Sequence, residues 1–200
     1  MKIKICGLTR PEDIEQACRL GADACGFVLA PSSRQVSWER LPELAAAVPT
    51  AVLSVAVMVN PTQQEADRAL ELVDRVQFHG SESPEFCARY GRRAWKAFRV
   101  KDADELSLLE SYRQAVGGFL LDSYVAGVAG GTGKTFAWEM LQGQRFSRPV
   151  FLAGGLNSAN VAEASQVTSV SGLDVSSGIE AAPGLKCPEK MIQFFAAARP

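Results

Sequence analysis

The chain opens with Lys2-Ile3-Lys4-Ile5-Cys6-Gly7, and a similar pattern returns at Phe119-Leu120-Leu121-Asp122-Ser123. Each stretch reads as a short apolar strand that ends in one ionisable side chain, Cys6 or Asp122. In parallel sheets the carboxyl ends of the strands meet at one rim, and functional side chains gather there. The two stretches therefore predict a parallel α/β enzyme in which Cys6 and Asp122 share a site.

Short apolar or β-branched runs alternate with amphipathic runs about eight times along the chain. The apolar runs are Lys2–Ile5, Ala24–Leu29, Val52–Val59, Arg75–Phe78, Ala94–Phe98, Gly118–Leu121, Val150–Leu152 and Val170–Val175. Helix-like segments between them include Pro11–Leu20, Trp38–Ala47, Pro61–Leu72, Pro84–Tyr90, Ala103–Tyr112 and Ser158–Ala164. Strands with little polar alternation that are joined by helices are typical of a parallel sheet covered on its outer face.

The number and size of these units favour a closed barrel. Eight units in 200 residues average about 25 residues each, near the lower end of what a (βα)8 barrel needs. A doubly wound open sheet is the alternative, but its glycine-rich loop would follow the first strand, whereas the glycines here cluster late. Because no linker or composition break interrupts the chain, we expect a single-domain (βα)8 TIM barrel over residues 1–200.

Composition narrows the possible partners. A formal net charge of −1 gives no reason to expect nucleic acid or a membrane surface as a partner. No run of about 18 apolar residues could span a bilayer, and the first strand pattern leaves no room for a signal peptide. Five scattered cysteines and one histidine offer no pair at zinc-ligand spacing. We therefore expect a cytoplasmic protein with reduced thiols and no bound metal.

Two late loops have the composition of a phosphate site. The first is Leu152-Ala153-Gly154-Gly155-Leu156-Asn157, and the second is Leu173-Asp174-Val175-Ser176-Ser177-Gly178. Glycines let backbone amides approach an anion closely, and serine hydroxyls add further donors. Either loop alone could be an ordinary turn. Together, after the seventh and eighth strands, they predict the phosphate site that barrels commonly build there.

A third glycine-rich segment, Gly130-Gly131-Thr132-Gly133-Lys134-Thr135, matches a nucleotide-binding P-loop only in part. A P-loop needs a glycine five positions before its Gly-Lys-Thr, and this chain has Val128 there. We favour a mobile loop over a site, spanning Gly127–Lys134, in which Lys134 could reach an anionic ligand.

Four side chains at or after the apolar runs could carry chemistry or binding. Cys6 could act as a base if cationic surroundings lowered its pKa, although a buried structural cysteine is the commoner case. Asp122 is either a loop cap or a proton donor. Arg34 could hold a carboxylate side-on or be solvated. His79, the only histidine, could be structural or face the site.

Taken together, the motifs resemble phosphoribosylanthranilate isomerase. They are Lys4–Thr9, Gly21–Asp23 with Gly26-Phe27, Pro31–Arg34, Val76–Gly80, Leu121–Ser123, Gly130–Phe136, Gly154–Asn157 and Asp174–Glu180. The match spans nearly the whole chain, and it departs from the family pattern at Phe78 and at Ala137. The resemblance implies a (βα)8 barrel that catalyses the Amadori rearrangement of N-(5-phosphoribosyl)anthranilate in tryptophan biosynthesis, without a cofactor.

The resemblance also implies a role for individual residues. Cys6 would be the general base, Asp122 the general acid, and Arg34 the residue that holds the anthranilate carboxylate. The residues expected to receive the phosphate, or to shape the loops that do, are Gly154, Gly155, Asp174, Ser176, Ser177 and Gly178. We add His79 to the expected substrate-binding residues because it follows a strand end.

Two other functions stay open at this level. The related barrel isomerase of histidine biosynthesis performs the same rearrangement, but it has two symmetric phosphate loops and an aspartate in place of Cys6. A non-catalytic module that binds a sugar phosphate or a nucleotide would keep the glycine loops without needing Cys6 and Asp122. We expect a phosphorylated small molecule as the ligand and a monomeric chain, with a homodimer as the alternative.

Overall fold

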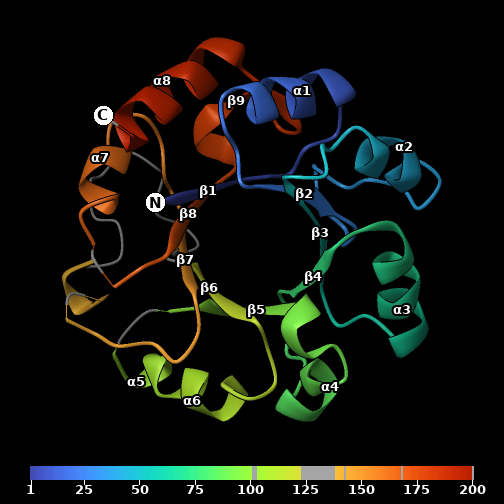
Figure 1. Cartoon of the computed structure of the whole chain (residues 1–200), viewed down its shortest axis with the longest axis vertical. Helices are drawn as coiled ribbons and strands as arrows, with labels where there is room; N and C mark the ends of the chain where they lie inside the picture. Colours follow the sequence, from blue (N-terminus) through green and yellow to red (C-terminus); the bar gives the residue numbers. More distant parts are fainter. Residues whose placement is uncertain (101–102, 123–137, 142, 168, 200) are drawn as a thin grey trace.

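The computed structural model describes residues 1–100, 103–122, 138–141, 143–167 and 169–199. Eight parallel strands close into a barrel, and helices surround it as an outer ring (Figure 1). The predicted (βα)8 fold is therefore confirmed, whereas the single domain over 1–200 stays a prediction. The P-loop-like segment, the Gly127–Lys134 loop and Ala137 lie outside the described residues.

Each strand pairs with the next one along the chain, and β8 pairs with β1 to complete the circle. The strands are β1 Lys2–Cys6, β2 Ala24–Val28, β3 Leu53–Met58, β4 Arg75–Phe78, β5 Ala94–Arg99, β6 Gly118–Asp122, β7 Val150–Ala153 and β8 Gly172–Val175. All eight predicted runs became strands, and their ends moved by at most two residues.

Seven of the described helices lie within the expected segments, though several are shorter and the segment Ala103–Tyr112 holds two of them. The last helix, Pro188–Ala198, was not among the expected segments. The helices are α1 Pro11–Arg19, α2 Leu41–Ala46, α3 Gln63–Leu72, α4 Pro84–Ala88, α5 Ala103–Leu106, α6 Leu108–Tyr112, α7 Val161–Ala164 and α8 Pro188–Ala198. Helix α3 begins after Pro61 because Thr62 and Glu65 form a capping box, in which each side chain binds the backbone N–H of the other residue. Within the described residues there are also three short 3₁₀ turns, Gly91–Arg93, Trp138–Leu141 and Ser177–Ile179.

A small antiparallel hairpin follows β8 and was not among the predicted elements. Its strands are β9 Glu180–Ala182 and β10 Leu185–Lys186, and it leads into α8. Among the helices that the structure describes, none has the length and apolar content needed to cross a bilayer.

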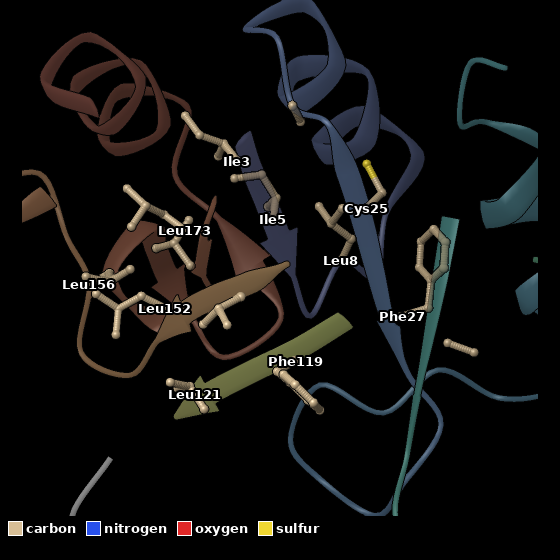
Figure 2. Close-up of a cluster of buried hydrophobic side chains, with 14 of the residues drawn as sticks. Ile3, Ile5, Leu8, Cys25, Phe27, Phe119, Leu121, Leu152, Leu156 and Leu173 are labelled. Carbon is tan, nitrogen blue, oxygen red and sulfur yellow. The ribbon is translucent and has the colours of Figure 1, made fainter. Parts of the chain in front are cut away.

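Strand residues alternate between an outer core and the barrel interior, as the two-residue period of a strand requires. Figure 2 shows part of the outer core, with Ile3 and Ile5 on β1 and further apolar side chains on β2, β6, β7 and β8. Inside the barrel, Trp95 stacks on Phe151 at 5.0 Å between ring centroids. Both belong to the early part of their strands, so they fill the amino-terminal half of the interior and leave space at the carboxyl ends, where polar and apolar side chains line a pocket.

Candidate active site

A pocket of ≈ 570 Å³ opens at the carboxyl ends of the barrel strands. This volume suits a small-molecule ligand. Nine of the ten predicted site residues line it: Cys6, Arg34, His79, Asp122, Gly154, Gly155, Asp174, Ser176 and Ser177. Gly178 is the predicted residue that does not line it. The structure thus brings together side chains from opposite ends of the sequence, because chain order sets strand order around the barrel.

Cys6 is the last residue of β1, and Lys4 lies two residues earlier on the same inward side. The buried Lys4 ammonium contacts Asp174 of β8, with 2.9 Å between Nζ and Oδ1. Gly26 on the neighbouring strand β2 leaves room for both groups, since a Cβ at that position would lie 3.1 Å from Cys6 Sγ and 3.1 Å from Lys4 Nζ. Cys6 is therefore placed beside a buried ion pair.

The groups around Cys6 have opposing effects on the pKa of its thiol. Burial raises the pKa of the Cys6 thiol, and Asp174 adds to the increase, while Lys4 and Lys186 oppose it. Burial also disfavours a charged Lys4, but Asp174 and Cys6 outweigh it and raise the pKa of that ammonium. The cationic surroundings that a thiolate base needs are present, although burial outweighs them in the ligand-free protein.

Asp122 is the last residue of β6, which lies three strands away from β1 around the barrel, and His79 directly follows β4. Figure 1 shows where these strands lie in the barrel. His79 Nε2 is 3.5 Å from Asp122 Oδ2. On the other side of the ring, Gln77 Nε2 is 3.4 Å from His79 Nδ1. A neutral imidazole that accepts from Gln77 at Nδ1 would carry its proton on Nε2, on the side that faces Asp122.

Arg34, in the loop after β2, forms a two-point contact with Glu180 of the hairpin. Nε donates to Glu180 Oε1 at 2.8 Å, and Nη2 donates to Oε2 at 2.6 Å. The side-on edge that we expected to hold a ligand carboxylate therefore holds Glu180 instead. The Nη1 end has no hydrogen-bond partner within the part of the chain that the structure describes, so it is the edge that a ligand can use.

Gly7 lets Arg34 cross the end of β1. Its φ of +72° lies in the left-handed region, and a Cβ there would come within 2.6 Å of Arg34 Cδ and 3.0 Å of Ser176 Oγ. A larger residue would therefore both strain the backbone and displace the arginine.

The loops after β7 and β8 form one surface of the pocket. Gly154 and Gly155 have φ of +91° and +65°, a conformation that favours glycine. Asn160 Nδ2 donates to the Gly155 carbonyl at 3.0 Å and holds this loop in place. Gly178 does not line the pocket, but it packs closely against the loop after β7. A Cβ at this position would lie 1.9 Å from the Leu156 carbonyl oxygen. Its place in the structure is thus a contact between the two loops.

Comparison with known proteins agrees with this geometry. The family model of N-(5'-phosphoribosyl)anthranilate (PRA) isomerase matches residues 3–197. The chain belongs to this family. A relative named N-(5'-phosphoribosyl)anthranilate isomerase, from Chromohalobacter salexigens, is 47% identical over 194 residues, which cover 96% of this chain and 92% of the relative.

Solved structures of the family share the same fold. Phosphoribosylanthranilate isomerase from Thermotoga maritima superposes with a TM-score of 0.91 at 36% identity and covers 100% of this chain and 98% of its own. A second isomerase structure holds reduced 1-(o-carboxyphenylamino)-1-deoxyribulose 5-phosphate. It has a TM-score of 0.86 at 33% identity and covers 100% of this chain and 98% of its own.

Several residues that line the isomerase pocket, or that contact the side chains lining it, received no role from the sequence. Lys4 could have been found, because its spacing of two from Cys6 places both on one face of a strand. Gln77 on β4 and Arg99 on β5 line the pocket itself, because their positions on these strands face the barrel interior. Glu180 and Lys186 carry no comparable local signal. Among the described residues, no group of three or more His, Cys, Asp or Glu side chains is arranged to hold a metal ion.

Proposed function

We infer that this chain catalyses the isomerisation of N-(5-phosphoribosyl)anthranilate to 1-(2-carboxyphenylamino)-1-deoxyribulose 5-phosphate in tryptophan biosynthesis. The reaction is an Amadori rearrangement, carried out by an intramolecular oxidoreductase of the aldose–ketose class. The family match over residues 3–197 carries the inference. The pocket supports it, because a thiol, a carboxyl group, an arginine and a glycine-rich loop pair surround one space of suitable size.

We propose that Asp122 is the general acid and Cys6 the general base. Asp122 donates a proton to the ribose ring oxygen, and the ring opens to a protonated imine at the anthranilate nitrogen. This cation acidifies the hydrogen on C2, which the Cys6 thiolate removes to give an enolamine. Tautomerisation then gives the ketone. The substrate nitrogen itself accepts the electrons, so the proposed reaction uses no cofactor and no metal.

Two anion-binding ends would hold the substrate between these groups. Nη1 of Arg34 is proposed to meet the anthranilate carboxylate, and the loops after β7 and β8 to receive the phosphate through Gly155, Ser176, Ser177 and Gly178. Gly154 and Asp174 shape those loops, and His79 contacts the substrate beside Asp122. Clamping both ends fixes the ribose between acid and base, which lowers the entropic part of the barrier.

The proposed roles need an ionised base and a protonated acid in the same molecule. Because burial raises the pKa of Cys6, the thiolate is a minor form of the free protein but a strong base once formed. We further propose a cytoplasmic location and a monomer, with a homodimer as the alternative. Light scattering on the purified protein distinguishes the two assembly states.

The roles of Cys6 and Asp122 can be tested by a fluorescence assay. Phosphoribosylanthranilate is generated in situ, and the loss of the anthranilyl signal is followed after enzyme is added. We expect metal-independent decay in the wild type. Cys6→Ser and Asp122→Val should each lower kcat by about 10²–10⁴-fold with little change in KM, since general acid–base groups contribute that much. Near-normal turnover in either variant would remove that residue from its role.

The same assay separates the alternative functions. A folded wild-type protein without decay would next be given the substrate of the histidine-pathway isomerase, which carries two phosphates. If that substrate also stayed unchanged while the reduced product analogue still bound, the chain would be a binding module. Tight binding of ATP instead would restore the P-loop interpretation of Gly130–Thr135.

A further inference from the structure

The hairpin after β8 places one buried carboxylate between two cations. The Glu180 side chain is only 4% exposed. Its two oxygens accept the paired hydrogen bonds from Arg34, and Oε1 is also 2.8 Å from Lys186 Nζ. A guanidinium that donates two hydrogen bonds from one edge to a buried carboxylate has little freedom to rotate. Glu180 therefore sets the direction in which the remaining edge of Arg34 points.

The buried Lys186 ammonium links the hairpin to two parts of the pocket wall. Besides Glu180, its Nζ donates to the Cys6 carbonyl at 2.7 Å and to the Ser176 carbonyl at 3.2 Å. Its donors are thus shared between the end of β1, the loop after β8 and the hairpin. Through Lys186, the strand end that bears the thiol and the loop that bears the serines are held at a fixed separation.

The hairpin itself is fastened to the first βα unit. Thr9 Oγ1 donates to the Gly184 carbonyl at 2.6 Å, and the Lys186 backbone N–H donates to Asp13 Oδ2 at 3.2 Å. Because these contacts join it to the loop before α1 and to α1 itself, the hairpin can act as a rigid support for Arg34.

The charges of the cluster explain why Arg34 needs both Glu180 and Lys186 beside it. A pair of the half-buried Arg34 and the buried Glu180 alone would be neutral and would attract an anion weakly. Burial lowers the pKa of the Lys186 ammonium, and Glu180 opposes that decrease. While Lys186 is protonated, the three side chains hold two cations and one anion, which leaves one net positive charge beside the pocket. Burial disfavours a charged Glu180, but hydrogen bonds from Arg34 and Lys186 outweigh it and lower the pKa of this carboxyl group, so it stays ionised.

We propose that Glu180 and Lys186 are positioning residues of the isomerase: Glu180 directs the free edge of Arg34 at the substrate carboxylate, and Lys186 keeps this cluster positively charged. The proposal rests on the proposed function, in which Arg34 holds that carboxylate. It assigns Glu180 an effect on the substrate carboxylate that passes through Arg34, and it assigns Lys186 an effect on both ends of the substrate through its contact with Ser176.

Two ligands separate these effects. One is the reduced product analogue, and the other is the same compound made with aniline, which lacks only the carboxylate. Calorimetry gives the ratio of their dissociation constants, here called the carboxylate ratio. We expect the wild type to favour the carboxylated ligand about tenfold or more, the usual worth of a charge-assisted hydrogen bond. If that ratio is near one, or Arg34→Met leaves it unchanged, the proposed role of Arg34 fails independently of Glu180.

The decisive variants are Glu180→Gln alone and Glu180→Gln combined with Arg34→Met. We expect Glu180→Gln to lower the carboxylate ratio to near one and to leave binding of the aniline ligand unchanged. In the Arg34→Met background it should add nothing. Equal weakening of both ligands by Glu180→Gln, or an effect that persists without Arg34, would show a merely structural residue and overturn the proposal.

Lys186→Met should weaken both ligands, because it removes charge near Arg34 and a support of the Ser176 loop. Unchanged affinity for both would overturn the part assigned to Lys186. Asp23→Asn is the matched control: Asp23 also pairs with an arginine, Arg199, at 2.7 Å, but at the amino-terminal end of the barrel. Asp23→Asn should leave the carboxylate ratio unchanged. A changed ratio in this control would mean that the ratio responds to the stability of the fold and not to the contacts of Arg34. That result would also overturn the assignment of Glu180.

Discussion

At the scale of single residues, burial and nearby charges have opposite effects on the pKa of Cys6. The thiol ends a strand inside the barrel, where loss of water raises its pKa, and the nearby Lys4 and Lys186 ammonium groups partly offset that effect. Gly26 leaves room for this arrangement, since a Cβ there would lie 3.1 Å from both Cys6 Sγ and Lys4 Nζ, closer than a relaxed contact. The reactivity of this thiol is therefore a property of its neighbours.

The pH dependence of Cys6 alkylation tests this account. Because the pKa of the thiol is raised, the thiolate forms only above the ordinary cysteine range of about 8.5. Iodoacetamide labelling of the Cys6 peptide, followed by mass spectrometry, should thus have its midpoint above that pH. Lys4→Met removes a charge that lowers the pKa, so its midpoint should move higher still. A midpoint at or below the ordinary value, or one that does not respond in a folded Lys4→Met variant, would contradict the account.

At the scale of elements, β8 and the loop that follows it carry two crowded glycines with different neighbours. A Cβ at position 178 would strike the Leu156 carbonyl at 1.9 Å, in the other phosphate loop. A Cβ at position 172 would strike the Phe151 ring at 2.5 Å, in the packed interior. One glycine therefore governs the spacing of the two loops, and the other governs only packing.

Substituting each glycine by alanine should separate these roles. Gly172→Ala overpacks the interior and should lower the free energy of unfolding by about 1–3 kcal/mol. Its Tm should still rise when inorganic phosphate is added, because bound ligand stabilises the folded state. Gly178→Ala pushes the loops apart, so phosphate should no longer raise its Tm. A normal phosphate response in Gly178→Ala would argue that loop spacing is not what the site depends on.

At the scale of the whole molecule, the barrel is closed by bringing the two ends of the chain together. Strand β8 pairs with β1. Beyond α8, Arg199 donates to the Gly21 carbonyl at 2.9 Å and the Met1 carbonyl at 3.2 Å and pairs with Asp23. These contacts lie at the end of the barrel opposite the pocket, so they serve stability and not catalysis.

Arg199→Ala should therefore separate stability from activity. Losing a half-exposed ion pair and two hydrogen bonds should lower the free energy of unfolding by about 1–2 kcal/mol, measured by urea titration. Because the pocket is unaffected, kcat/KM should stay within about twofold of the wild type, less than the tenfold that 1.4 kcal/mol would produce. A loss of kcat/KM at unchanged stability would reveal a coupling between the two ends of the barrel.

Much of this molecule could be predicted from its sequence because the signals are local. The eight apolar runs became the eight strands, and Cys6 and Asp122 fell at strand ends as their positions in the runs indicated. The Gly154-Gly155 pair and the Ser176-Ser177-Gly178 segment fell in the loops after β7 and β8 for the same reason. Chain order determines strand order in a (βα)8 barrel, so residues at successive strand ends must meet at one rim.

The tertiary structure alone decided how those residues are supported. Lys4 meets Asp174 across 170 residues, Arg34 meets Glu180 across 146, and Lys186 meets Cys6 across 180. Pairs so far apart in the sequence produce no periodic pattern that could reveal them. For this reason the sequence predicted that the side-on edge of Arg34 holds a ligand, whereas Glu180 occupies that edge. Burial likewise decides the pKa of Cys6, because the cost of desolvating a charge depends on packing that only the closed barrel creates.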